Sequence, residues 1–151
     1  MKISHENFTN VKQDIQPLLE LHWAETEPNQ DTIKLDPDWS EYFRLSEAGV
    51  LKIFTARNNG KLVGYCVVMI SQSIHHKDHI FAGTDVVYVH PEFRKSSTGS
   101  DLIKFAENYC EENGASIMTL NMKTSHPFDN LMLNMGFDLI ERVYHKCFLG
   151  K

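Results

Sequence analysis

The sequence has few cysteines, no long apolar segment and no signal-peptide pattern. Its three cysteines, Cys66, Cys110 and Cys147, are too scattered for a disulfide framework or a Cys-x-x-Cys metal site, which favours a reducing compartment. The longest apolar run, residues 62–70, is far shorter than the roughly 20 residues of a membrane-spanning helix. Residues 1–7 are polar and lack the apolar core of a signal peptide. We therefore expect a cytoplasmic protein with no membrane partner.

Basic residues are also too few for a nucleic-acid footprint. Lys and Arg number 15 against 20 Asp and Glu, which gives a formal net charge of −5 and an isoelectric point near 5.9. A chain without a basic excess has no general attraction for phosphate backbones. We expect no nucleic-acid partner, and the acidic balance favours a cationic acceptor such as an amine.

No repeat, low-complexity tract or linker rich in proline and glycine divides the chain, so residues 1–151 are expected to form a single domain. Periodicity and capping residues predict helices over 11–27, from Asp36-Pro37 to Gly49, over 98–113 and over 128–135. Strands are predicted over 50–57 and 61–70, joined at Asn58-Asn59-Gly60, then over 80–89, 116–122 and 137–149. The polar stretch 71–78 is interpreted as a loop.

This order places a hairpin before a strand–helix–strand crossover and a terminal strand or strand pair. Such an arrangement predicts an α/β (α+β) fold, in which helices cover both faces of one mixed sheet.

The segment over residues 85–100 is the most informative part of the chain. A strand runs into a loop of small polar residues that opens a helix, so that several backbone N–H groups and the helix dipole point at one spot. Arg94 and Lys95 add positive charge, the hydroxyl groups add donors, and Gly99 permits close backbone approach. The hydroxyl donors are Ser96, Ser97, Thr98 and Ser100. The segment is typical of a pyrophosphate site, although such loops also serve merely as helix caps.

The flanks of this loop carry a family resemblance. The run Val89-x-Pro91-Glu92-x-Arg94-x-x-x-x-Gly99-Ser100, followed by Leu102-Ile103, resembles the acetyl-CoA motif of GNAT acetyltransferases. Asn134-Met135-Gly136-Phe137 is similar to the family's junction between its last helix and the next strand. The resemblance implies a twisted, mostly antiparallel sheet with a splayed central strand pair. Leu19–Trp23 and Glu141–Lys146 look most like short bacteriophage-type members.

The resemblance implies direct acetyl transfer from acetyl-CoA to an amine-bearing acceptor. The backbone of Val87, Tyr88 and Val89 would bond the pantetheine amides, and residues 94–100 would hold the pyrophosphate. Asp85 is the candidate general base, with the alternative that it binds backbone or a cation. Tyr88 is a candidate proton donor, with packing as the alternative.

Two residues depart from the family pattern. Ser97 stands where the first loop glycine is usual, and Met132 stands where many members have a proton-donating tyrosine. These departures motivate an alternative reading, a catalytically weak or inactive CoA-binding module of the same fold. Transfer of a longer acyl group is a further alternative.

Two other groups of residues favour structural roles. The imidazoles of His75, His76 and His79 are expected in a solvated loop near the acceptor entrance, since a zinc site would want a further ligand; no metal is expected. The aromatic residues of the first two helices are expected in the core or in the contact of a homodimer: Trp23, Trp39, Tyr42 and Phe43.

Overall fold

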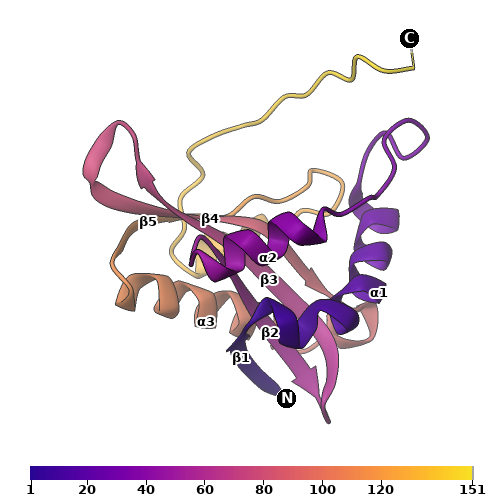
Figure 1. Cartoon of the computed structure of the whole chain (residues 1–151), viewed down its shortest axis with the longest axis horizontal. Coiled ribbons are helices and arrows are strands. Elements are labelled where there is room, and N and C mark those ends of the chain that lie inside the picture. Colours follow the sequence, from indigo (N-terminus) through magenta and orange to yellow (C-terminus); the bar gives the residue numbers. More distant parts are fainter. Residues whose placement is uncertain (151) are drawn as a thin grey trace.

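The computed structural model, which describes residues 1–150, contains a five-stranded sheet with helices on both faces (Figure 1). The strands lie in the order β1-β2-β3-β4-β5, with every neighbouring pair antiparallel except β4 and β5. Their bounds are Lys2–Glu6, Leu51–Asn58, Lys61–Ser73, His76–Val89 and Ala115–Thr119. The helices are α1 (Phe8–Thr26), α2 (Trp39–Glu47), α3 (Thr98–Glu112) and α4 (Asp129–Asn134), with a 3-10 helix, η1, over Pro91–Phe93. The predicted fold class is confirmed.

The N-terminal part has one strand more than predicted. β1 pairs antiparallel with β2 along its whole length, and its short, mostly polar sequence offers no clear period. α2 begins after Asp38 rather than after Asp36, because the Asp38 side chain accepts a hydrogen bond of 3.0 Å from the amide of Glu41. That bond satisfies one of the unpaired N–H groups of the first helical turn.

Two hairpins build the centre of the sheet. The first turn is as predicted, because Asn59 and Gly60 adopt φ values of 51° and 84°, which match the twist of a two-residue hairpin. The prediction of a loop over 71–78 is wrong, since β3 continues to Ser73 and β4 begins at His76. Backbone pairing, with a bond from the Gln72 side-chain amide group to the Lys77 carbonyl, holds this end of the ribbon, whose side chains are largely exposed and therefore carry no apolar pattern.

Apolar side chains pack against both faces of the sheet. The core under α1 and α2 includes Val11, Ile15, Ile53, Tyr65 and Val67, and the core under α3 includes Phe54, Cys66, Val68, Leu102 and Ala106. β3 is buried on both faces, which explains its continuous apolar run. Trp39 and Tyr42 pack on Phe8 at centroid distances of 5.9 and 5.7 Å, as expected for core aromatics, whereas Phe43 is 45% exposed.

The prediction of strands over 137–149 is wrong. This segment forms no strand and extends away from the sheet as a long arm (Figure 1). Leu139, Ile140, Val143 and Tyr144 are 68–89% exposed. Apolar residues occur here in pairs four positions apart, so neither face of a strand would be uniformly apolar. The outer edge of β5 consequently has no neighbouring strand within residues 1–150.

Candidate functional site

β4 is irregular at the point where it loses its neighbour. Val67 pairs with Val86 and Val68 with Thr84, so Asp85 is an additional residue at a β-bulge. Pairing between β4 and β5 ends at Gly83 opposite Thr119. The bulge therefore coincides with the end of strand pairing. The Asn121 amide still donates to Thr84 Oγ1 at 3.2 Å, and beyond this contact the second half of β4 has no strand on this edge, as the predicted splayed strand pair requires.

The loop after β4 directs unpaired backbone donors outward. α3 has Ser97 at its N-cap, and its first internal bond runs from the Asp101 amide to the Ser97 carbonyl at 2.8 Å. Within residues 1–150, the N–H groups of Ser97, Gly99 and Ser100 have no acceptor. Together with the positive end of the helix dipole, these three groups form a site suited to a phosphate oxygen.

The hydroxyl groups of this loop bond within the loop itself. Ser96 Oγ lies 2.6 Å from the Phe93 carbonyl oxygen and 2.7 Å from Thr98 Oγ1, and the Thr98 residue is only 2% exposed. Ser97 Oγ donates to Asp101 Oδ2 at 2.7 Å. The structure thus gives the predicted hydroxyl ligands a structural role and leaves the backbone N–H groups available.

Neither small residue of the motif is strained. Ser97 has a φ of −77°, so the position needs no glycine for its backbone conformation. A Cβ added to Gly99 would contact only the Val89 side chain, at 3.8 Å. Internal packing therefore does not demand glycine at 99, and its absent side chain keeps the start of α3 open to a ligand.

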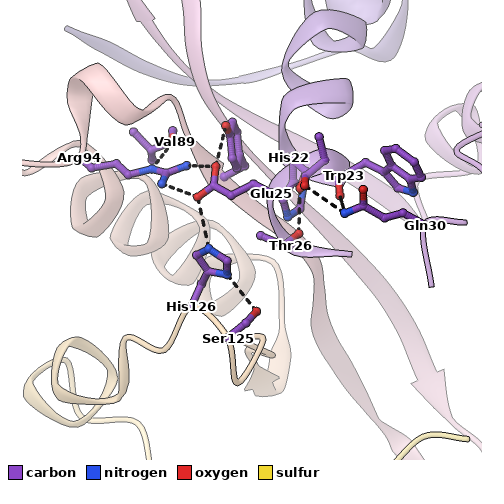
Figure 2. Close-up of polar contacts among 11 residues, drawn as sticks. His22, Trp23, Glu25, Thr26, Gln30, Val89, Arg94, Ser125 and His126 are labelled. Atoms are coloured by element: carbon purple, nitrogen blue, oxygen red, sulfur yellow. Dashed lines mark hydrogen bonds and ion pairs between the residues drawn. The ribbon is translucent and has the colours of Figure 1, made fainter. Parts of the chain in front are cut away.

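Arg94 is paired with a residue that the sequence analysis did not single out. Its guanidinium donates to Glu25 Oε1 at 2.5 Å and to Oε2 at 2.7 Å, and its Nε donates to the Val89 carbonyl at 2.8 Å (Figure 2). It also lies over the ring of Tyr88, 5.2 Å from the centroid. The Arg94 charge is therefore met within the protein, while the Lys95 ammonium has no partner among the described residues.

Glu25 joins three parts of the chain. Besides Arg94, its carboxylate accepts a hydrogen bond of 3.2 Å from Tyr88 Oη and lies 3.7 Å from His126 Nε2 (Figure 2). The hydrogen bond from Arg94 is the main cause that lowers the pKa of Glu25. The end of α1, the end of β4 and the loop after β5 are thereby connected at one carboxylate.

Tyr88 remains a protonated phenol in this setting. Burial, and after it the charge of Glu25, raises its pKa. The ring of His22 stacks on Tyr88 at a centroid distance of 4.9 Å, and burial lowers the pKa of that imidazole. Glu25, His22 and His126 are distant in sequence, so no local pattern indicates that they meet.

Asp85 faces a small open pocket of about 230 Å³ between α2 and the bulge. Its apolar lining residues are buried or half-buried and form the floor: Tyr42, Leu45, Leu51 and Met69. Its acidic lining residues are half-buried or exposed and form the rim: Asp38, Glu41 and Asp85. The Asp85 carboxylate has no hydrogen-bond or ion-pair partner within residues 1–150. Although solvent reaches it, surrounding protein raises its pKa, and Glu27 contributes in the same direction.

The structure shows packing or hydrogen-bonding contacts for two further residues named in the sequence. Met132 is 6% exposed and packed inside, with its carbonyl accepting from the Phe137 amide at 3.0 Å. His79 lies in the β3–β4 hairpin, 2.8 Å from Ser116 Oγ. Among the described residues, no three histidine, cysteine or acidic side chains are grouped as metal ligands, and no helix is long and apolar enough to cross a membrane.

Comparison with known proteins finds a family model that matches this chain and solved structures with a similar fold. The model of the acetyltransferase (GNAT) family matches residues 15–137, whereas no curated protein matches significantly. A ribosomal-protein-alanine N-acetyltransferase of Brucella melitensis superposes with a TM-score of 0.73 at 20% identity, covering 98% of this chain and 100% of the other.

Two further solved structures show the same fold. An aminoglycoside acetyltransferase from an uncultured soil sample, bound to sisomicin, has a TM-score of 0.75 at 17% identity, covering 99% of this chain and 96% of the other. An acetyltransferase of Clostridium acetobutylicum with acetyl-CoA has a TM-score of 0.74 at 14% identity, covering 99% and 97%. At these identities the likeness shows the fold alone.

Proposed function

Because the chain belongs to the GNAT acetyltransferase family, we propose that it transfers the acetyl group of acetyl-CoA to a primary amine by direct attack. The observation that carries this proposal is that three features lie along one stretch of chain. The bulge at Asp85 and the separation from β5 after Gly83 are on β4, and the unpaired N–H groups follow at the start of α3. Together they offer one continuous path for an elongated anionic cosubstrate.

The residues present fit acetyl-CoA along this path. The N–H groups of Ser97, Gly99 and Ser100 would hold the pyrophosphate, with the Lys95 ammonium beside them. The β4 backbone at Val87 would carry the pantetheine arm, since β5 has left that edge. The Tyr88 backbone faces β3 instead, in phase with the His90 amide that donates to the Val63 carbonyl, so its predicted backbone contact with the cofactor is not supported. Val89 contributes less than expected, because its carbonyl already accepts from Arg94.

Asp85 is the group suited to accept the proton of the acceptor. An ammonium must lose one proton, to Asp85, before its nitrogen can attack the thioester carbon. As the amide bond forms and the carbon–sulfur bond breaks, the nitrogen loses a second proton, which balances the one that the thiolate takes up. The Asp85 carboxylate has no partner to release first, and its raised pKa makes it a better base than an ordinary aspartate. This favours the base role over the alternative in which Asp85 binds backbone.

Tyr88 is the candidate donor to the departing thiolate. Its hydroxyl holds a proton at neutral pH, because its pKa is raised. In this structure that proton is donated to Glu25, so the hydroxyl must turn toward the thiolate during the reaction. The buried thioether of Met132 has no proton to give.

An assay of thiol release over a panel of primary amines, together with calorimetric titration of acetyl-CoA, tests this function. We expect acetyl-CoA to bind and at least one amine to release free CoA. Failure of acetyl-CoA to bind would contradict the proposal. Binding without release on any amine would instead support the alternative, a CoA-binding module, which the buried Met132 favours.

We also infer that the molecule associates as a homodimer through the arm over 137–149. The arm exposes the large apolar side chains of Leu139, Ile140, Val143 and Tyr144 in two neighbouring pairs, which a free chain would leave in contact with water. A second copy would cover it reciprocally, as closed dimers do. Sedimentation equilibrium should show a dimer, and a monomer at every concentration would refute this. Membership of the short bacteriophage-type group remains a prediction from Leu19–Trp23 and Glu141–Lys146.

A further inference from the structure

We propose that the pocket between α2 and the β4 bulge binds the hydrocarbon stem of an aliphatic primary amine and presents its nitrogen to Asp85. This inference rests on the proposed function and narrows its acceptor to one chemical class, an ammonium group on an unbranched carbon chain. It is based on the position of the pocket, on the side chains that line it and on the negative charge at its rim.

The pocket lies beside the reaction site. Asp85 belongs both to its rim and to the bulge at which β4 separates from β5. Its volume of about 230 Å³ equals roughly eight water molecules at liquid density. That space suits a chain of four or five carbons with its terminal nitrogen, and it is too small for an oligosaccharide.

The apolar floor favours a hydrocarbon chain over a sugar ring that carries hydroxyl groups. Leu45, Leu51 and Met69 come from α2, β2 and β3, and none of them offers a hydrogen-bond donor or a strong acceptor. Sugar hydroxyls that are desolvated on such a floor would lose their bonds to water without replacement. A run of methylene groups loses nothing there and gains from leaving water.

The rim selects a donor-only cation. Its three carboxylates accept hydrogen bonds and donate none, and the Tyr42 hydroxyl is the single donor among the lining side chains. An ammonium group has donors only, so it complements this rim, whereas a hydroxyl or a carboxylate does not.

Within the rim, Asp85 is the carboxylate left for the ligand. Glu41 is paired with Arg44 at 2.5 and 2.8 Å, and Asp38 accepts from the Glu41 amide at 3.0 Å. Asp85 has no such partner within residues 1–150. A cation attracted by the acidic rim is therefore drawn to the carboxylate that is placed to take its proton.

The test is a chain-length series on the intact protein. Thiol release is measured with diamines of three, four and five carbons, with glucosamine, and with a blocked tripeptide that contains a single lysine. We expect kcat/KM to rise about two- to fourfold for each added methylene, mainly through a lower KM, because each one leaves water for the floor. Glucosamine should be the poorest acceptor. Preference for the peptide or for the free diamine distinguishes a lysine side chain from a small-molecule acceptor.

Two substitutions test whether the dependence of kcat/KM on chain length arises in the pocket. Leu45→Asn should flatten the chain-length series, because it puts an amide on the apolar floor. Leu133→Asn, at a 58% exposed leucine of α4 outside the pocket, should leave the series unchanged. If Leu45→Asn does not fold, the wild-type series and the glucosamine comparison still decide.

Each outcome has one meaning. Turnover with a flat series, or with glucosamine preferred, overturns the pocket inference and leaves the acetyltransferase function standing. If acetyl-CoA binds without turnover, calorimetric titration with 1,5-diaminopentane decides: binding weakened by Leu45→Asn supports the pocket, and no binding overturns it. If acetyl-CoA does not bind, the proposed function itself fails.

Discussion

The Glu25 carboxylate and the Arg94 guanidinium form a two-point ion pair, at 2.5 and 2.7 Å, across 69 positions of sequence. Arg94 follows η1, and Glu25 lies in the last turn of α1. The pair therefore connects the start of the anion-binding loop to α1 (Figure 2). A motif residue expected to meet phosphate is thus paired with an internal carboxylate, and phosphate must compete with that carboxylate for it.

Glu25→Gln should strengthen CoA binding. Removal of the carboxylate charge leaves Arg94 with an unpaired positive charge near the α3 N-terminus, and we expect the dissociation constant of CoA to fall several-fold in calorimetric titration. Glu41→Gln breaks a comparable arginine pair on α2 and should leave CoA affinity unchanged. Weaker CoA binding by Glu25→Gln would show that the pair positions the loop rather than competing with the ligand.

The same variant should also lose stability in a pH-dependent way. The pKa of Glu25 is lowered in the folded protein, so the pair stabilises the fold above the unfolded pKa of about 4.3, and this contribution is lost as pH falls through the lower, folded pKa. A partly exposed pair contributes up to about 1 kcal/mol. Thermal melts should therefore show a lower Tm for Glu25→Gln at pH 7, and the difference from wild type should shrink as pH falls below about 4.

Asp85→Asn should reduce activity and raise stability at once. Loss of a general base typically lowers kcat by about 10²- to 10⁴-fold. The pKa of Asp85 is raised in the fold, so the ionised carboxylate opposes folding as pH rises through that pKa. We expect a higher Tm than wild type at pH 7 and no difference near pH 3. Full activity in the variant would exclude Asp85 as the base.

Replacement by alanine should weaken CoA binding at one glycine and lower the stability of the fold at another. Gly99→Ala should fold normally, because its Cβ meets only Val89 at 3.8 Å, yet it should weaken CoA binding at least several-fold by obstructing the α3 N-terminus. Gly64→Ala would place a Cβ 3.1 Å from the Tyr88 carbonyl oxygen and should cost about 1–3 kcal/mol in denaturant unfolding. Unchanged CoA affinity in Gly99→Ala would exclude close phosphate approach there.

Tyr88→Phe separates the hydroxyl from the ring. The ring contacts with His22 and Arg94 are retained, while the hydrogen bond to Glu25 is lost at a cost of about 1 kcal/mol. If Tyr88 protonates the thiolate, kcat falls with little change in the KM for acetyl-CoA. Equal single-turnover rate constants in the variant and the wild type would instead show that the tyrosine serves only in packing.

The features that the sequence predicted well are those encoded by neighbouring residues. Asn59-Gly60 specifies its hairpin, and the strand–loop–helix order before Gly99 specifies the donor site, because the relevant groups belong to consecutive positions. The bulge at Asp85 and the contact of Glu25 with Arg94 depend on strand register and helix packing, for which a single sequence has no local signal. The arm over 137–149 has strand-forming residues but pairs with no strand, although the outer edge of β5 is unpaired, and composition alone cannot reveal that.

The extra residue at Asp85 also reverses the phase of the strand that follows it. Before it, even-numbered Ala82 belongs to the core under α3; after it, even-numbered Val86 and Tyr88 belong to the side of α1 and α2. Because Thr84 and Val86 pair with the adjacent residues Val68 and Val67, deletion of residue 85 would leave this pairing in register and Tyr88 on the side of Glu25. The bulge thus absorbs the extra residue locally, so its deletion should remove the Asp85 carboxylate and the bend of β4 while the last four residues of the strand keep their helix layers.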